Sequence, residues 1–521
     1  MYKNILRLLT PRCTSCLNQQ IRTYKTQLSD ERVEFLSQVL DIPRVSADYM
    51  CARYPMLIRL REPNLKSVID TVTNLGLNRE LLVESPVVFS IKPLTLKHRC
   101  QVLQECGLHT ITGYHISNFL NIIKTRTIGD LKKDGILSET NIENRLASYF
   151  TQWPTSLTTS IQCDVNKLTL YNLRLKIIQS YLEFTIHLTQ EEFDKGLYTY
   201  PTIKLRPLQM ISTTIPLLLD VINMPESKIK SNLYLIHANS ENLKHSIYDV
   251  KTIAGVDIKD VLRMYPKLCL TKVENLVEIK QIFEEYGISD EAQLKCLNIY
   301  TLSPKTIKER LKNIKEVPEF QVYRNHPRFL KIVMYNKNAL RRVIDMYKIS
   351  KRCLSLNCLS GCDNDFQKFV NAPGDRSGKG KDLLYCITYE LGKGYSVTDV
   401  RKKIKRHPFW INIPLVHVRL MFYKLITDFS KNDIYENCTI LLYPIQNVKE
   451  AIKIVENNDS SKLYMSPPFL EHVDTTKLTK SQILSLVLYM LEKDHYFSGN
   501  GVWIDEKSVN NIELNKISES N

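Results

Sequence analysis

The sequence predicts an all-α fold, a solenoid in which a helical repeat of about 30 to 36 residues is stacked many times. Three observations predict it: prolines recur with similar local sequence, apolar residues between them follow helical spacing, and glycine is scarce, at 16 of 521 residues. Scarce glycine disfavours phosphate-loop and dinucleotide-binding folds, whose turns need several. Because one such repeat cannot bury its own apolar stripe, we expect stacked repeats with one long concave face.

The recurring prolines share a local pattern of Pro, any residue, two apolar residues, a polar or small residue, and an apolar residue. Full matches occupy residues 55–60, 86–91, 327–332 and 408–413, and variants begin at Pro201, Pro266 and Pro444. The first two matches begin one repeat apart, and so do the match at Pro408 and the variant at Pro444. Proline has a fixed φ and no amide hydrogen, so each one is predicted to end one helix and begin another.

Some repeats lack the proline. The tripeptide Glu-Asn-Leu at 241–243 recurs one repeat later at 274–276, and the same offset places Leu233 where Pro266 stands. Degenerate repeats are predicted at Pro304 and around Phe119. Helices are predicted within each repeat; from residue 273 to a stop at Gly287, for example, apolar side chains follow a spacing of three to four residues, at Val273, Leu276, Ile279, Phe283 and Tyr286.

Composition narrows the class of partner. The chain is 43% apolar and 24% charged, as globular proteins are. Lys and Arg number 71 against 55 Asp and Glu, and the net charge of +16 favours a polyanionic partner, nucleic acid or anionic lipid. The 13 cysteines form no regular framework, which favours a reducing compartment. No apolar run approaches the length that a membrane-spanning helix needs, so we predict no membrane span.

The first 25 residues have the character of a mitochondrial presequence. Residues 1–29 contain no acid, and a short apolar stripe at 5–9 lies among the cations Lys3, Arg7, Arg12, Arg22 and Lys25. We expect processing near residue 24 or 25; the alternative is an unstructured basic tail. Removing these five charges leaves a net charge of +11, so the basic surplus does not come from this segment.

The series of repeats resembles the mitochondrial transcription termination factor (mTERF) family, most of all its insect transcription-regulating members. The stretch Leu302-Ser303-Pro304 with Arg310-Leu311 and the C-terminal segments 486–489 and 497–501 add to the resemblance, which covers roughly residues 45–500 and is strongest from 230 onward. The departure is greatest over residues 95–200, where Trp153-Pro154 keeps the proline without the apolar pattern, so repeat boundaries there stay open.

The resemblance implies repeats of two helices and a short 3₁₀ turn, wound into a left-handed superhelix with a basic path along duplex nucleic acid. It also implies a role in mitochondrial gene expression. We divide the chain into a presequence (1–25), divergent N-terminal repeats (26–230), C-terminal repeats (231–495) with an inserted loop at 371–381, and a C-terminal tail (496–521).

The strongest candidate binding segment is a run of cations at residues 401–406. Val397, Val400 and Ile404 are expected on the buried side of a helix, which leaves five cations facing outward: Arg401, Lys402, Lys403, Lys405 and Arg406. Each phosphate that such a cation neutralises releases counterions and so strengthens binding. A merely solvated face is the alternative, although no acid lies between Val400 and Pro414 to pair with these charges.

Further cations recur near the repeat turns. Arg263 and Lys267 flank Pro266, and Arg324 and Arg328 flank Pro327; Arg310 and the pair Arg341-Arg342 complete the candidate set. A cation at the same point of each repeat would draw a line along the superhelix. Taken singly, each is as well explained as an ordinary surface charge.

Other chemistry finds little support. The loop Gly374-Asp-Arg-Ser-Gly378-Lys-Gly380-Lys fails the phosphate-loop spacing and has glycine where the Mg²⁺-binding hydroxyl should stand. Cys353, Cys358 and Cys362 cluster without the paired spacing or nearby histidine of a zinc site. No nucleophile–base or paired-carboxylate motif appears. We therefore predict no enzyme, no cofactor and no metal.

The sequence thus predicts a protein of the mitochondrial matrix, at the nucleoid, that regulates transcription by occupying duplex mitochondrial DNA. Two alternatives remain: a factor that binds ribosomal RNA in ribosome assembly, and an adaptor for a DNA-bound protein of the same family.

Overall fold

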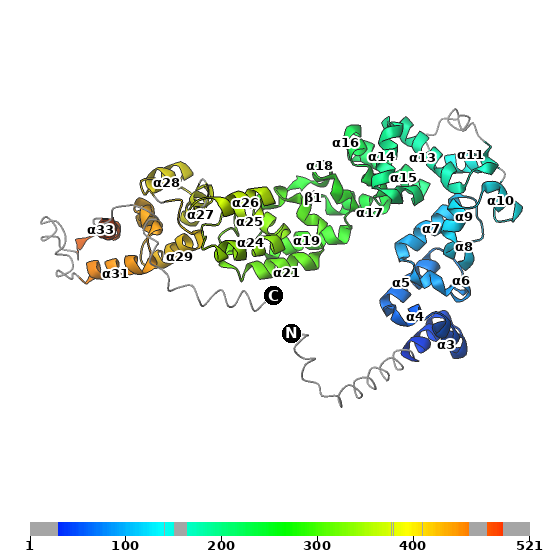
Figure 1. Cartoon of the computed structure of the whole chain (residues 1–521), viewed down its shortest axis with the longest axis horizontal. Helices are drawn as coiled ribbons and strands as arrows, with labels where there is room; N and C mark the ends of the chain where they lie inside the picture. Colours follow the sequence, from blue (N-terminus) through cyan, green and yellow to red (C-terminus); the bar gives the residue numbers. More distant parts are fainter. Residues whose placement is uncertain are drawn as a thin grey trace. The chain divides into compact units, whose positions relative to one another are not determined.

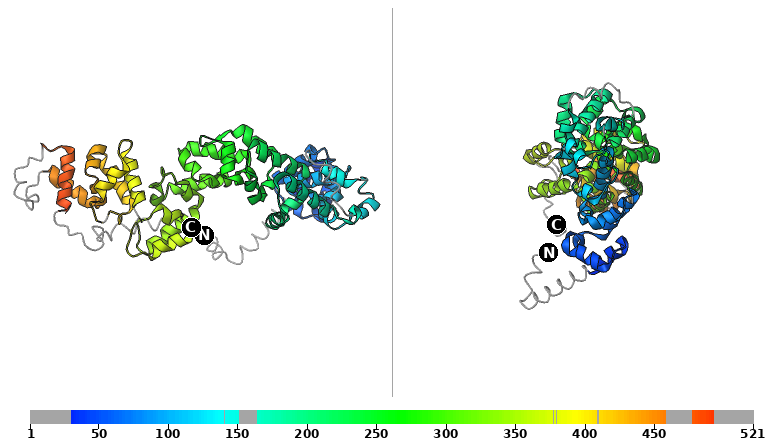
Figure 2. Two further views of the ribbon diagram at one scale, coloured as in Figure 1. Left: turned by 90° about the horizontal axis from the view of Figure 1, so that it is seen from above. Right: turned by 90° about the vertical axis from the view of Figure 1, so that its right-hand side faces the viewer.

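The structure is a computed structural model that describes residues 30–139, 141–150, 164–376, 378, 380–408, 410–457 and 477–492. Within these ranges the chain is almost entirely helical, as Figures 1 and 2 show. The only strands there are β1 (Thr252–Ile253) and β2 (Val256–Asp257), an antiparallel hairpin whose turn residues Ala254 and Gly255 both have positive φ. The predicted presequence, the tail at 496–521 and Trp153-Pro154 lie outside the described residues.

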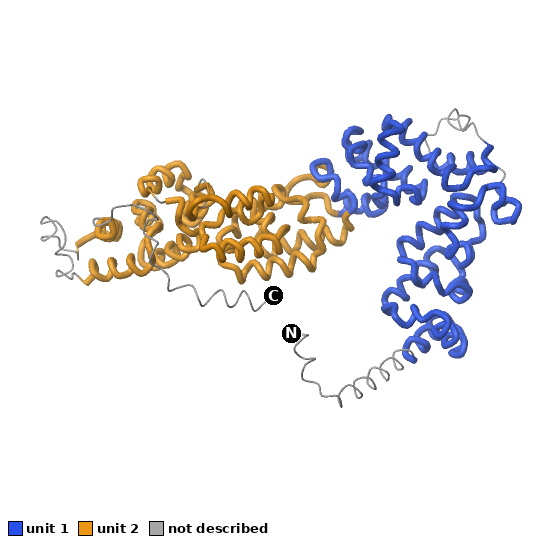
Figure 3. The backbone as a smooth tube through the Cα atoms, viewed as in Figure 1, with its two compact units in different colours: residues 1–249, 262–270 blue, residues 250–261, 271–521 orange. Residues whose placement is uncertain are grey.

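The chain forms two compact units (Figure 3). Unit 1 comprises residues 1–249 and 262–270, and unit 2 comprises residues 250–261 and 271–521. The division predicted after residue 230 therefore falls inside unit 1. The all-α helical-repeat fold is confirmed, whereas the left-handed sense of the superhelix stays a prediction.

Successive repeats of unit 1 follow one plan, a first helix, a short 3₁₀ or helical segment, and a second helix. In chain order they are α3 (Arg44–Arg53), α4 (Met56–Arg59), α5 (Glu62–Asn74); α6 (Glu80–Glu84), η1 (Pro86–Ser90), α7 (Pro93–Glu105); α8 (Gly113–Ser117), α9 (Phe119–Lys124), α10 (Ile128–Lys133); α11 (Ile142–Ala147), η2 (Val165–Lys167), α13 (Leu170–Ile186); α14 (Gln190–Thr199), η3 (Pro201–Leu205), α15 (Leu208–Pro216) with π-helix η4 (Leu217–Val221); and α16 (Glu226–Ser231), η5 (Leu233–His237), α17 (Ser240–His245) with π-helix η6 (Ser246–Val250).

The following repeats, most of them in unit 2, keep the plan, except that among the described residues no helical segment lies between α28 and α29. They are α18 (Ile258–Met264), η7 (Pro266–Leu270), α19 (Val273–Glu285); α20 (Asp290–Leu294), η8 (Leu297–Thr301), α21 (Pro304–Ile314); α22 (Pro318–Gln321), α23 (Leu330–Met334), α24 (Asn336–Lys348); α25 (Leu356–Ser360), α26 (Asp363–Asn371), α27 (Lys381–Leu391); α28 (Val397–Ile404), α29 (Leu415–Leu425); and α30 (Lys431–Glu436), η9 (Cys438–Leu442), α31 (Ile445–Glu456), before α33 (Lys480–Glu492).

At three of its occurrences the proline pattern builds a five-residue 3₁₀ helix, whereas Pro55 and Pro327 precede the short α-helices α4 and α23. Pro86, Pro201 and Pro266 each occupy its first position, where the missing amide hydrogen costs nothing. The two apolar residues of the pattern face the core: in η7, Leu268 and Cys269 are buried between the exposed Lys267 and Leu270. The 3₁₀ turn that the resemblance implies is therefore present, and η5 begins at Leu233, as predicted from its offset to Pro266.

Two of the predicted motif prolines are out of register. The 3₁₀ helix near Pro444 is η9, which starts at Cys438, and Pro444 instead caps α31. Likewise η8 starts at Leu297, and Pro304 is the first residue of α21. Both prolines stand at the start of a helix, as predicted, but it is the second helix of the repeat, because proline suits the start of any helix and the sequence alone does not say which one it starts.

The predicted inserted loop corresponds to residues 372–380, between α26 and α27. The interval from Pro327 to Pro408 also holds a complete repeat, α25 to α27, so the loop is not the sole reason for its length. The Asp375 carboxylate accepts the backbone N–H groups of Arg352 and Cys353 at 2.7 and 2.9 Å, and Asn412 donates to the carbonyl of Asp375. The loop is thus tied to its neighbours on both sides.

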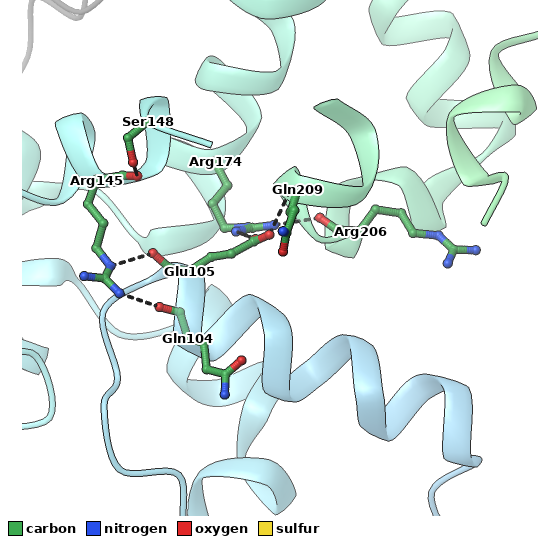
Figure 4. Close-up of polar contacts among 7 residues, drawn as sticks. All are labelled: Gln104, Glu105, Arg145, Ser148, Arg174, Arg206 and Gln209. Atoms are coloured by element: carbon green, nitrogen blue, oxygen red, sulfur yellow. Dashed lines mark hydrogen bonds and ion pairs between the residues drawn. The ribbon is translucent and has the colours of Figure 1, made fainter. Parts of the chain in front are cut away.

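A buried ion pair joins distant parts of unit 1 (Figure 4). Arg174, in the second turn of α13, lies 2.7 Å from the carboxylate of Glu105 at the end of α7, and their side chains are only 1% and 3% exposed. Arg174 also donates to the carbonyl of Arg206, and Glu105 accepts the N–H of Gln209 at 3.0 Å. Arg145 donates to the carbonyls of Gln104 and Glu105. This cluster, the Glu105–Arg174 clamp, holds α7, α11, α13 and α15 together.

Breaking this pair should destabilise unit 1. Arg174→Met leaves the Glu105 carboxylate buried without a counter-charge, a change that costs about 3–5 kcal/mol in comparable sites. Urea denaturation should show this loss, and hydrogen exchange should quicken in α7, α13 and α15 rather than in unit 2. Replacing both partners, as Glu105→Leu with Arg174→Met, should restore much of the lost stability because no buried charge is then left alone.

The exposed Glu62–Lys66 pair of α5 is the control, with 2.9 Å between its charged groups. Lys66→Gln should cost less than about 1 kcal/mol. Equal losses from the buried and exposed pairs would contradict the clamp's structural role.

Candidate nucleic-acid interface

Cations recur three residues before the start of several motifs. Lys230, Arg263, Arg324 and Lys405 precede Leu233, Pro266, Pro327 and Pro408 by this interval. Each lies in, or just after, the last turn of the first helix of its repeat, where the helix dipole favours a positive charge. The recurrence therefore has a structural explanation that holds whether or not a ligand is bound.

Helix α28 presents the predicted run of cations. Ser396 caps it by accepting the N–H of Asp399, and Val400 and Ile404 are fully buried against α27 and η9. The cations exposed to solvent on this helix and the turn after it are Arg401, Lys402, Lys405 and Arg406. Four positive side chains so close together in the chain can contact neighbouring phosphates of one backbone.

Two details of α28 differ from expectation. Val397 is 49% exposed rather than buried, because packing against the neighbouring elements begins one turn later, at Val400. Lys403 turns toward the next repeat, where its ammonium lies 2.7 Å from Glu436 and 4.6 Å from the ring centre of Tyr435. The pairing of Lys402 with Asp399 at 3.6 Å joins two largely exposed groups and holds little energy.

A groove of about 780 Å³ opens in unit 2 beside α20, α23, α24 and α25. Arg328 lies in it and donates to the side chain of Asn357 at 2.9 Å. Most of the other polar side chains in the groove can donate hydrogen bonds: Lys295, Asn298, Lys331, Asn338 and Asn357. Two acids, Asp363 and Asp365, also line it. Such donors suit phosphate and sugar oxygens.

Arg342 lines the same groove, but the structure contradicts its predicted role as an exposed contact. It is 3% exposed, and its guanidinium donates to the carbonyls of Cys358, Leu359 and Gly361. It also lies 2.8 Å from Asp363. These bonds attach α24 to α25, so Arg342 is a structural residue. Its neighbour Arg341 faces solvent.

Arg310 also has a structural task. Its guanidinium donates to the carbonyls of Val333 and Met334 at 3.0 and 2.6 Å, at the C-terminal end of α23, and it is only half-exposed. These carbonyls have no partner within the helix, so the arginine caps the next repeat.

The remaining predicted cations divide between the two units. Arg263 and Lys267 belong to unit 1, with Lys267 exposed and Arg263 half-exposed. Arg324 is exposed in unit 2, close in sequence to the groove residue Arg328. The structure therefore brings Arg328 and Arg342 to one groove and the four α28 cations to one helix end.

Sequence reasoning missed two cations of the groove, Lys295 and Lys331. Lys331 stands four residues after Pro327, at the polar position of the proline pattern, so the sequence pattern could have identified it as a candidate. Lys295 stands two residues before η8, whose start at Leu297 was misplaced to Pro304. The correct register would have placed it beside a repeat turn, one residue off the interval that the other cations keep.

The clustered cysteines have no ligand geometry. Cys353 and Cys358 are buried, and burial raises the pKa of the Cys358 thiol to about 12, whereas Cys362 is exposed. Across the described ranges, no group of three or more His, Cys, Asp or Glu side chains is placed to hold a metal ion. None of the helices described there is long and apolar enough to cross a membrane.

Comparison with known proteins identifies a relative. The sequence is 30% identical over 476 residues to "Transcription termination factor 5, mitochondrial" of Drosophila melanogaster, an alignment that covers 91% of this chain and 83% of that protein. No family model matches the sequence, and no solved structure matches it.

The neighbours Arg341 and Arg342 allow a matched test of the assigned roles. Arg342→Gln should lower the free energy of unfolding by about 2–4 kcal/mol, because buried carbonyls and an aspartate lose a charged donor. Arg341→Gln should leave the melting temperature nearly unchanged, since its side chain faces water. Thermal unfolding followed by circular dichroism distinguishes them; a stable Arg342→Gln protein would return Arg342 to the set of candidate contacts.

Proposed function

The chain belongs to the mitochondrial transcription termination factor family, and from this premise we propose that it regulates transcription by occupying duplex mitochondrial DNA. Its place of action is then the mitochondrial matrix, at the nucleoid. The observation that carries the proposal is the group of four exposed cations at the end of α28, with Val400 and Ile404 buried behind them.

Electrostatics supplies the affinity. Duplex DNA carries a dense line of phosphates, and each one that a lysine or arginine neutralises releases bound counterions. The α28 cations and the donors of the unit 2 groove are such partners, and the net charge of +16 attracts DNA from a distance. We propose these surfaces as the phosphate contacts.

Specificity needs side chains that reach base edges. Exposed arginines are suited to guanine in the major groove, where two N–H donors match O6 and N7. Arg324 and Arg341 are exposed and lie in repeats that also contribute to the unit 2 groove. We propose them as candidates for base reading, and Arg263 and Lys267 of unit 1 as further backbone contacts.

The proposed activity is binding without catalysis. The groove of unit 2 offers cations and amides, which hold an anionic backbone, and its chemistry needs no cofactor. The same donors could also bind the phosphates of ribosomal RNA. Binding to a duplex DNA and to a structured RNA of equal length is therefore compared.

The purified chain should bind duplex DNA with an affinity that falls steeply as salt rises. If about 6–10 phosphates are contacted, the slope of log K against log salt should be on the order of −5 to −9. Fluorescence anisotropy on a labelled duplex measures it. A flat response, or firm binding to structured RNA with none to DNA, would overturn the proposal.

The α28 cations can be removed without disturbing the fold. Substituting Gln for Arg401, Lys402, Lys405 and Arg406 preserves helix propensity and leaves the buried face intact, so the melting temperature should hold. Loss of four phosphate partners should make the salt slope shallower by up to about 3–4.

The control removes two exposed cations of α31, as Lys449→Gln with Lys453→Gln, and should leave the slope nearly as in the parent. A quadruple variant that melts normally and keeps the parent slope would show that the α28 cations form a solvated face only.

A further inference from the structure

Two repeats, one from each unit, carry different chemistry at the same positions, the repeat at Pro201 in unit 1 and the repeat at Pro327 in unit 2. At one and four residues after the start of the motif, unit 2 has Arg328 and Lys331, which line its polar groove. Unit 1 has Thr202 and Leu205 at the same points after Pro201, and both line a groove of its own. The eighth residue after Pro86 is Leu94, where the eighth after Pro327 is Tyr335. Leu205 and Leu94 thus stand where the unit 2 groove has Lys331 and Tyr335.

The unit 1 groove has a volume of about 310 Å³ and lies where the starts of α7 and α9 meet the end of η3. Its apolar lining comes from Leu94, Phe119, Leu120 and Leu205. Leu94 is 52% and Leu120 is 47% exposed. Two exposed leucines on one groove leave apolar surface in water that a partner would cover.

Two half-buried arginines stand at this groove, Arg99 and Arg206. The Nε of Arg206 donates to Nδ1 of His237 at 3.2 Å, and its Nη1 lies 3.2 Å from Nδ1 of His98. Burial and the nearby Arg206 lower the pKa of each histidine to about 4, so both histidines are neutral at pH 7. They accept hydrogen bonds from Arg206 but supply no negative charge to balance its guanidinium.

Arg99 is in a similar position, because it donates to the carbonyl of Ile116 and lies 5.4 Å from the ring centre of Phe119. Burial lowers the pKa of both arginines. In the part of the chain that the structure describes, neither has an ion pair with a carboxylate. An incoming carboxylate would supply the missing counter-charge.

We propose that the unit 1 groove is a docking site for a protein partner, which inserts a large apolar side chain between Leu94, Leu120 and Leu205 and sets a carboxylate against Arg99 and Arg206. The partner segment is therefore short, acidic and apolar. Anchors of this kind, one apolar side chain in a pocket with a charged neighbour, dominate many protein interfaces.

A nucleic acid fits this groove less well. Leu94, Leu120 and Leu205 in its lining offer no hydrogen bond to a phosphate backbone. Base stacking needs an open aromatic face, and Phe119 is only 2% exposed. The proposal is independent of DNA binding through unit 2, because it concerns other residues.

The test selects a phage-displayed library of random 12-residue peptides on the full-length chain. The groove variant is Leu94→Ser with Leu120→Ser, and the matched control is Leu420→Ser, another half-exposed leucine, on α29. All three substituted positions are exposed enough for the fold to persist, which a thermal melt checks. Selected peptides are then synthesised and titrated by fluorescence anisotropy.

The expected peptides carry a large apolar residue and an excess of Asp or Glu. Their affinity should fall at least tenfold in the groove variant and hold in Leu420→Ser. Changing the acids of the peptide to Asn or Gln should weaken binding similarly, which tests the arginines without altering the protein. Peptides that bind independently of the groove, basic peptides, or loss of duplex DNA affinity in the groove variant would each overturn the proposal.

Discussion

No repeat of this chain can bury its own apolar residues, and the stacking of one repeat on the next follows from that constraint. A pair of short helices has one apolar stripe, which only a neighbouring repeat can cover. The 3₁₀ helices show how this is done: η3, η5 and η7 contact one another in sequence, and Tyr200 and Tyr234 meet edge to face with ring centres 5.7 Å apart. A Cβ on Gly196 would collide with a methyl group of Leu233, so α14 packs directly on the Leu233 side chain of η5.

This constraint explains how much of the fold the sequence could predict. Contacts between neighbouring repeats recur, so the residues that make them recur in the sequence. The second occurrence of Glu-Asn-Leu, for example, predicted that a repeat motif starts at Leu233, which is not a proline. The pattern failed at Pro304 and Pro444, because proline suits the first turn of a second helix as well as the start of a 3₁₀ helix. Residues 95–200 left the repeat boundaries open, because the repeats α8 to α10 and α11 to α13 have no proline at the start of their middle segments.

The candidate interface was predictable only where its residues are adjacent in the chain. The α28 cations follow one another, and helical spacing alone separates them from Val400 and Ile404. The unit 2 groove is assembled from α20 to α25, so no local pattern combines Lys295 with Arg328. Arg342 shows the limit most clearly, because it differs from Arg341 only in facing carbonyls that α25 supplies.

The clamp in unit 1 also has a mechanical consequence. Glu105 bonds Gln209, which is far along the chain, while Arg174 and Arg145 fasten the segments between them. A pull on the chain from either side of this region cannot peel α8, α11 or α13 away one at a time. These helices resist extension as a single block, until the force ruptures an ion pair shielded from water.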